Sequence, residues 1–247
     1  MAKQATVQTV EESPRPRGRP RKTDSAIGSE AELTKSAIID KAIALARQMP
    51  LSDISMVQLA REFDVAPGLI HYYIGNRDNL ISGVLNYYYG DRVRRLPALT
   101  GHWRNDVEKM ANVLLAHATD HPGIAQYIAS HNRFRLFQQV GGNETDYGVV
   151  YFDYVAQAFL QGGFKPKQVA LAFHLLMQFL VASSTAQASR QLPADHKEFI
   201  KAKFEELDSA KYPAAKKVGV PFSSLDSKQA FEAGLKLLLD GFAQWLK

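Results

Sequence analysis

The sequence predicts an all-α protein, and three observations lead to this fold class. From Leu33 onward, apolar residues recur at spacings of three and four, which is the period of an amphipathic helix. Runs that alternate polar and apolar residues, as half-buried strands do, are missing from the sequence. Capping residues and Pro or Gly breaks separate the periodic segments. We therefore expect a small helical domain followed by a larger one.

The composition excludes several classes of function. The chain has 247 residues, of which 46% are hydrophobic, and it has no cysteine. Disulfides, thiol chemistry and cysteine-ligated zinc are therefore excluded. We expect no membrane contact, because no apolar run approaches the roughly 18 residues that span a bilayer. The polar, proline-containing start lacks the apolar core of a signal peptide, so we expect a cytoplasmic protein.

The net charge of +5 comes from one short segment, residues 13–23, which contains five cations and no acid. We interpret residues 1–29 as a flexible basic arm, because they lack an apolar period. Within the arm, Pro16-Arg-Gly-Arg-Pro-Arg-Lys22 resembles an AT-hook. This resemblance implies that Arg17, Arg19 and Arg21 lie in a narrow A·T minor groove. The alternative is a solvated tail that attracts phosphates without base preference.

The next segments predict four helices in succession. Thr34 can cap the first helix, which Met49-Pro50 ends. Ser55, with Gln58 three residues later, forms a capping box for a helix over 56–63, which turns Val57, Leu59, Ala60 and Phe63 inward. Pro67 begins a short third helix that reaches Tyr73. Asn76 caps a fourth helix, Arg77–Arg95, and we place a domain boundary between residues 96 and 97.

The second and third helices have the properties of a DNA-binding helix-turn-helix. Ala60 is small enough for two helices to cross closely, and Val65 can fill the turn between them. Gly68 lets the third helix approach a DNA backbone. The polar tips of His71, Tyr72 and Tyr73 can then face the major groove.

The segment 56–80 resembles the tetracycline-repressor family of bacterial regulators. The shared features are a Leu-Ala pair in the second helix, a valine in the turn, an aromatic pair closing the third helix, and the Asn-Arg-Asp-x-Leu start of the fourth. The resemblance implies that Arg77 holds a phosphate at a helix N-terminus and that Leu69 contacts a thymine methyl. The complete set of implied DNA contacts outside the arm is Ser55, Met56, Pro67, Gly68, Leu69, His71, Tyr72, Tyr73 and Arg77.

Two features leave the DNA contacts open. Leu69 and His71 stand where the family usually has a threonine or serine and a tyrosine, so the bases that are read cannot be inferred. We expect one tyrosine of the pair to be core packing, with Tyr72 favoured for that role. His71 has the alternative of a solvated helix residue.

The chain beyond residue 97 predicts further helices and a sensor domain. We expect helices over 102–119, 124–131, 147–160, 166–189, 194–209 and 228–246, with a loop over 212–224. Pro166–Ser189 and Lys228–Leu246 are too apolar to be solvated, so we expect them to form a four-helix bundle in a homodimer. Two recognition helices in such a dimer would address DNA half-sites one helical turn apart.

We expect the remaining helices to enclose a cavity for an aromatic or hydrophobic effector, although plain core packing is the alternative. The candidate lining is Trp103, Tyr127, His131, Phe134, Tyr151, Tyr154, His174 and Met177. His117 and His121 are four residues apart and could share a metal, but the sequence shows no third ligand. We therefore predict neither a metal nor a cofactor.

These features together favour a homodimeric repressor that a small molecule releases from a pseudo-palindromic operator. Ligand binding would shift the helix Arg77–Arg95 and change the separation of the recognition helices. An architectural protein that bends DNA without a ligand is the second class, and a filled core would favour it. An enzyme is the third class, for which the sequence shows no nucleophile–base pair, phosphate loop or metal cluster. The sign of regulation, repressor or activator, stays open.

Overall fold

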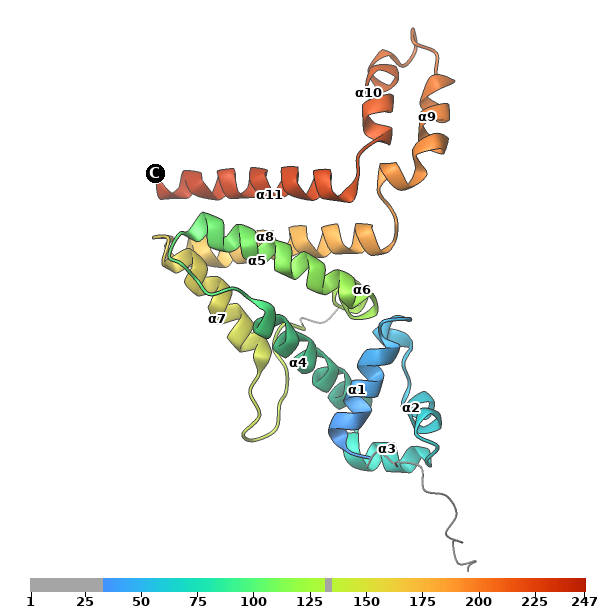
Figure 1. Cartoon of the computed structure of the whole chain (residues 1–247), viewed down its shortest axis with the longest axis vertical. Coiled ribbons are helices and arrows are strands. Elements are labelled where there is room, and N and C mark those ends of the chain that lie inside the picture. The colour runs from blue at the N-terminus through green and yellow to red at the C-terminus, as the bar shows by residue number, and fades with distance from the viewer. Residues whose placement is uncertain (1–32, 132–134) are drawn as a thin grey trace, which may run out of the picture. The chain divides into compact units, whose positions relative to one another are not determined.

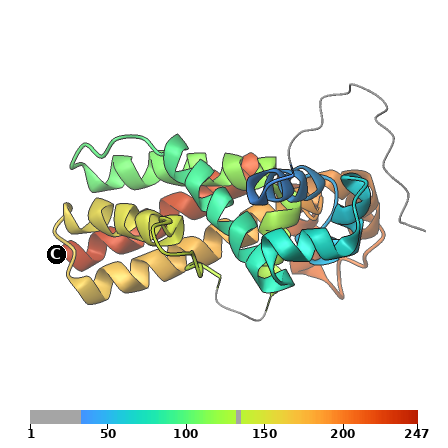
Figure 2. The same cartoon turned by 90° about the horizontal axis from the view of Figure 1, so that it is seen from below.

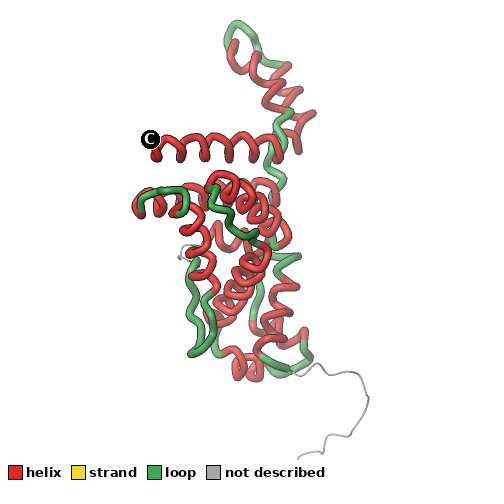
Figure 3. The backbone as a smooth tube through the Cα atoms, turned by 60° about the vertical axis from the view of Figure 1, so that its left-hand side comes forward, coloured by secondary structure: helices red, strands yellow, loops and turns green. Residues whose placement is uncertain are grey.

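The computed structural model describes residues 33–131 and 135–247, and within these ranges all regular structure is helical (Figure 3). This confirms the predicted all-α class. The basic arm lies outside the described residues, and so does Phe134.

Four helices form the N-terminal part of this structure: α1 (Lys35–Leu45), α2 (Met56–Glu62), α3 (Pro67–Ile74) and α4 (Arg77–Arg95) (Figure 1). Their starts follow the predicted caps. The Thr34 hydroxyl accepts from the N–H of Ala37 at 3.1 Å, and the Ser55 hydroxyl from that of Gln58 at 3.0 Å. The Asn76 side chain does the same for α4. Because each cap satisfies an otherwise unpaired N–H, these positions fix where the helices begin.

The packing of α2 differs from the prediction on one face. Leu59 and Ala60 are buried as expected, but Val57 is 47% exposed and Met56 takes the inward position at 7%. Asp64 ends the turn after α2 with a left-handed φ of 51°, and α2 and α3 pack on each other. The predicted inward position of Val57 is therefore wrong by one residue.

The C-terminal part is built around α8 (Pro166–Ala188), which packs against α5 (Trp103–Asp120), α6 (Pro122–Ser130), α7 (Tyr147–Leu160) and α11 (Ser227–Ala243). Helices α8 and α11 lie side by side (Figures 1 and 2). The chain ends in a short 3₁₀ helix, η3 (Gln244–Leu246), and another, η1 (Leu51–Asp53), precedes α2.

A two-helix hairpin lies between α8 and α11. It consists of η2 (Pro193–His196), α9 (Lys197–Glu205) and α10 (Pro213–Ser223), which pack on one another and stand apart from the other helices in Figure 1. The prediction of a loop over 212–224 is wrong. Gly219 lets the Phe204 ring pack on the helix backbone, where an added Cβ would lie 2.2 Å from that ring. Pro221 lies inside α10 and removes one of its backbone hydrogen bonds.

The apolar helix α8 corrects one expectation about composition. By length and composition alone, the segment Pro166–Glu205 could cross a membrane, with a mean hydropathy of 1.6 over its most apolar 18 residues. Core helices of globular proteins meet the same criteria. Only a third of that window (33%) is buried within the chain, although α8 packs on four other helices.

Helix α4 belongs to both parts of the structure. It packs against α1 and α3 near its start and against α5 and α7 further along. Tyr88, Tyr89 and Arg92, in its second half, are buried. The boundary that the sequence predicts after residue 96 stays a prediction, because α4 joins the two sets of helices without a break.

The second connection between the two parts is a backbone contact at the start of α6. The Gly123 N–H donates to the Ala46 carbonyl at 3.1 Å. A Cβ added to Gly123 would lie 2.1 Å from the Met49 oxygen. The close approach therefore requires glycine at this position.

We predict that Gly123→Ala lowers the free energy of unfolding by about 1–3 kcal/mol, the usual cost of overpacking. Gly68→Ala is the matched control, because Gly68 is also the second residue of a helix that starts with proline, and an added Cβ there meets nothing within 4 Å. Urea unfolding followed by circular dichroism measures both. Equal stabilities of the two variants would contradict the close contact.

Candidate DNA-binding helix and ligand cavity

Helix α3 presents one face to solvent. Ile70 and Ile74 hold its other face in the core, while Leu69 is 40% exposed and Tyr72 80%. Pro67, Gly68 and His71 are also exposed. These residues of α3 were predicted to touch DNA, and the structure brings them together on one accessible face.

The aromatic pair at the end of α3 reverses one expectation. Tyr72 is 80% exposed and Tyr73 38%, with their rings edge to face at 5.3 Å. The expectation that Tyr72 is core packing is therefore wrong. The reason is geometric, because Ile70 and Ile74 are four residues apart and take the inward positions of this two-turn helix.

His71 is bonded locally. Its Nδ1 lies 2.9 Å from the Gly75 carbonyl oxygen. A carbonyl only accepts, so Nδ1 carries the proton and Nε2 remains an acceptor. Such an acceptor suits the amino group of cytosine or adenine in the major groove.

The start of α2 offers fewer contacts than predicted. Met56 is 7% exposed and belongs to the core, so its predicted DNA contact is corrected. Ser55 is half-buried, and its hydroxyl caps α2. Val57, which the sequence assigned to the interior, is the exposed apolar residue of this turn.

Arg77 links the start of α4 to the segment before α2. One terminal N–H group donates to the Ile54 carbonyl at 2.8 Å, and the other terminal nitrogen donates to the Ser52 carbonyl. A movement of α4 would therefore act directly on the helix-turn-helix. The phosphate contact inferred for Arg77 stays a prediction, and the side chain is exposed.

A cavity of about 490 Å³ lies between α4, α5, α6, α7 and α8. Four residues predicted for a ligand site line it: His131, Tyr151, His174 and Met177. The rest of its lining is mostly apolar or aromatic: Tyr88, Tyr89, Arg92, Leu114, Ala118, Ala125, Ile128, Ala129, Arg135, Leu136, Phe173, Gln178, Leu180, Val181 and Ser184.

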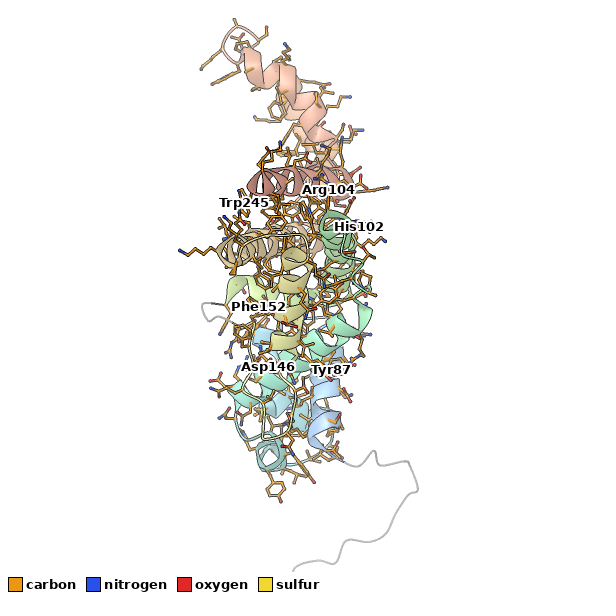
Figure 4. The ribbon with its side chains drawn as sticks, turned by 90° about the vertical axis from the view of Figure 1, so that its left-hand side faces the viewer. Tyr87, His102, Arg104, Asp146, Phe152 and Trp245 are labelled. Carbon is orange, nitrogen blue, oxygen red and sulfur yellow. The ribbon has the colours of Figure 1, made fainter. Side chains whose placement is uncertain are left out.

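Three other predicted lining residues lie elsewhere, which corrects the predicted site. Trp103 packs against Phe164, with ring centroids 4.9 Å apart, and its neighbour Arg104 pairs with Asp240 of α11 (Figure 4). The Tyr154 hydroxyl donates to the Pro97 carbonyl at 2.6 Å. Tyr127 is buried and stacks on His131 at 4.4 Å, so it supports the lining without forming it.

Part of the polar lining comes from α4, which the sequence assigned to the DNA-binding domain. Arg92 is 9% exposed. Its guanidinium lies over the rings of Tyr88, Tyr89 and Tyr151, at 4.6, 5.6 and 5.2 Å from their centroids. It also donates to the Tyr88 hydroxyl and, at 3.4 Å, to Nδ1 of His117.

Asp91, His117 and His121 bring one ligand atom each within 4.8 Å of one another. Asp91 is thus the third group that the sequence did not reveal. The surroundings do not fit a metal, because Arg95 lies 2.8 Å from the Asp91 carboxylate. Since Nδ1 of His117 accepts from Arg92, the proton lies on Nε2, which faces Asp91 at 3.2 Å. A protonated nitrogen does not ligate a metal, and the arrangement is an Asp91–Arg95 ion pair with the neutral His117 beside it.

The segment between α6 and α7 connects the cavity wall to α4. Arg135 lines the cavity and pairs with Asp78 in the first turn of α4 at 3.6 Å. Asn86, in the middle of α4, donates to the Thr145 carbonyl at 3.0 Å and accepts from the Tyr147 N–H at 2.9 Å. One lining residue, Arg135, and the chain at the start of α7 are therefore bonded to α4.

An exposed helix-turn-helix joined by one helix to a ligand-sized cavity is typical of ligand-sensing transcriptional regulators. A family model described as the tetracyclin repressor-like C-terminal domain matches residues 96–246, more than half of the chain. The chain therefore belongs to the tetracycline-repressor family of transcriptional regulators, as the resemblance of its helix-turn-helix implied.

Solved structures share this fold. The apo form of ActR from Streptomyces coelicolor is 24% identical, with 86% of this chain and 97% of that chain covered and a TM-score of 0.69. ActR in complex with actinorhodin is 23% identical, with 87% of this chain and 98% of that chain covered and a TM-score of 0.72. The regulator SCO7222 from the same organism is 19% identical, with 87% of this chain and 100% of that chain covered and a TM-score of 0.67. Comparison with curated protein sequences gave no match.

Burial, and next the nearby Arg92 guanidinium, lower the pKa of His117 from 6.5 to about 2. Burial also lowers the pKa of His121. The unfolded chain therefore binds these protons at a higher pH than the folded chain does. We predict that the free energy of unfolding falls as the pH falls below 6.5, by up to about 1.4 kcal/mol per pH unit for each histidine.

Urea unfolding at pH 7.5, 6.5 and 5.5 measures this slope. His117→Gln keeps a side-chain acceptor for Arg92 and removes one titrating group, so its slope should be smaller. An identical slope in the variant would contradict a neutral, buried His117.

Proposed function

We propose that this protein is a homodimeric repressor that binds a pseudo-palindromic operator through α3. A small molecule in the cavity releases it. The single observation that carries this proposal is the position of α4, which lines the cavity with Tyr88, Tyr89 and Arg92 and holds the helix-turn-helix through Arg77. The protein would act in the cytoplasm, where the operator is.

The apolar and aromatic lining supports an aromatic or hydrophobic effector rather than a cofactor. ActR, which shares the fold, has been solved with actinorhodin bound. Ligand binding fits the cavity better than catalysis does. Ser184, the serine in the described lining, donates its hydroxyl to the Val181 carbonyl of its own helix, so it has no base to activate it.

A homodimer is supported by apolar residues that α8 and α11 leave exposed. Leu237 on α11 is 73% exposed and Leu171 on α8 is 49% exposed, although both helices bury their opposite faces in the protomer. A second copy would cover these residues in the four-helix bundle that the sequence predicts.

We predict that the protein sediments as a dimer and that Leu237→Glu shifts it toward monomer. Selection from random duplexes should recover two half-sites about 34–36 Å apart, one helical turn. Leu160→Glu is the control, since Leu160 is 47% exposed at the end of α7, outside the proposed bundle. A wild-type monomer, or single half-sites from the selection, would contradict the proposal.

We predict that Arg77→Gln weakens binding to operator DNA and to non-operator DNA by the same factor. It should also lower the slope of log affinity against log salt concentration by about 0.9, the value for one phosphate contact. Arg77→Lys should keep the slope, because it keeps the charge. Fluorescence anisotropy at several salt concentrations measures both. The control is Arg104→Gln, which removes an arginine paired with Asp240. If Arg77→Gln keeps the salt dependence of the wild type, Arg77 contacts no phosphate and bonds only to the Ser52 and Ile54 carbonyls.

For the arm, we propose minor-groove contact by Arg17, Arg19 and Arg21. Deletion of residues 1–29 should then reduce affinity mainly for operators with A·T flanks. The comparison is with the same operator in G·C flanks, at one salt concentration. Equal losses on both flanks would reduce the arm to an unspecific charge effect.

A further inference from the structure

The cavity wall has an unusual charge balance. Two arginines, Arg92 and Arg135, line the cavity, and its described lining includes neither aspartate nor glutamate. Arg135 has a carboxylate partner in Asp78. We propose that the ligand of this cavity is an aromatic acid, with a carboxylate or other ionised group held by Arg92. The inference rests on the proposed ligand-sensing function and names the class of its effector.

Arg92 lacks a counter-ion among the described residues. Its sequence neighbour Asp91 faces other cations, with Arg95 at 2.8 Å and Arg94 at 3.6 Å from its carboxylate. The groups that do contact Arg92 are neutral. Burial raises the pKa of Tyr88 and raises that of Tyr151 to about 12, so both phenols keep their protons. His117 is neutral for the reason given above.

Neutral partners compensate only part of the cost of burying this charge. Three tyrosine rings face the guanidinium, and cation–π contacts are weaker than a charge-assisted pair with a carboxylate. An arginine has five N–H donors, and those of Arg92 bond to His117, Tyr88 and Tyr151. An acid group would supply the missing negative charge and accept from donors that remain, in the bidentate geometry that arginine favours.

The surroundings of Arg92 also specify the rest of the ligand. Phe173, Met177, Leu114 and Ile128 line the same cavity, and a volume of about 490 Å³ is within the range of drug-sized ligand sites. One charged group on an aromatic body therefore fits the wall better than a uniformly polar or uniformly apolar molecule. Because Arg92 is part of α4, the acid group would act directly on the helix that holds the helix-turn-helix.

Two fluorescent probes that differ in one charged group test this inference. 8-Anilino-1-naphthalenesulfonate is an aromatic anion, and N-phenyl-1-naphthylamine is the same ring system without the acid. Both are titrated into the full-length protein. We expect the anion to bind at least about ten-fold more tightly, which corresponds to one charge-assisted contact. Arg92→Gln should reduce this ratio to about one by weakening the anion alone.

Two further variants keep the test interpretable. Arg92→Lys keeps the positive charge and should retain a preference for the anion even if the glutamine variant folds poorly. Arg104→Gln removes an arginine that is 40% exposed and paired with Asp240, and it should bind both probes as the wild type does.

The outcomes separate the two levels of the proposal. Equal affinities for both probes in the wild type, or an anion preference that survives in folded Arg92→Gln, would overturn the aromatic-acid inference and leave the ligand-sensing function intact. Failure of both probes to bind the wild type would contradict the cavity as a ligand site and, with it, the proposed function.

Discussion

Helix α4 must satisfy two sets of neighbours with one rigid backbone, and the other features of this structure depend on that constraint. Its 19 residues correspond to about 28 Å of helix. Arg77 at one end bonds to the Ser52 and Ile54 carbonyls, and Arg92 near the other end forms part of the cavity wall. A displacement at one end therefore reaches the other without an intervening loop.

The contacts around α4 suggest how a ligand changes DNA affinity. Asp78 pairs with the cavity residue Arg135, and Asn86 bonds to Thr145 before α7. Gly123 bonds α6 to the end of α1. A ligand that fits the cavity better in one position of α4 shifts the population toward that position. In the proposed dimer, two such shifts change the separation of the two α3 helices. The affinity for a fixed operator spacing then falls.

Local features of the sequence were predictable, and those that depend on distant contacts were not. Thr34, Ser55 and Asn76 cap helices through bonds within three residues, so their pattern is visible in the sequence. Which of Met56 and Val57 is buried was not predictable, because in a helix of two turns the apolar pattern is compatible with either residue facing the core. The sequence also does not show which tyrosine of the pair is exposed, because that depends on how Ile70 and Ile74 dock α3 on the other helices. Arg92 was missed for a different reason, since its cavity combines residues of five helices.

We propose that occupation of the cavity moves the two recognition helices of a dimer relative to each other. Since the chain has no cysteine, Arg61→Cys provides a single spin-label position on α2, at an exposed residue outside the predicted DNA contacts. Pulsed electron–electron double resonance then measures the distance between the two labels in the dimer. We expect one narrow distribution with operator DNA and a shifted one with saturating 8-anilino-1-naphthalenesulfonate. The same distribution in both states, with the probe bound, would contradict the account.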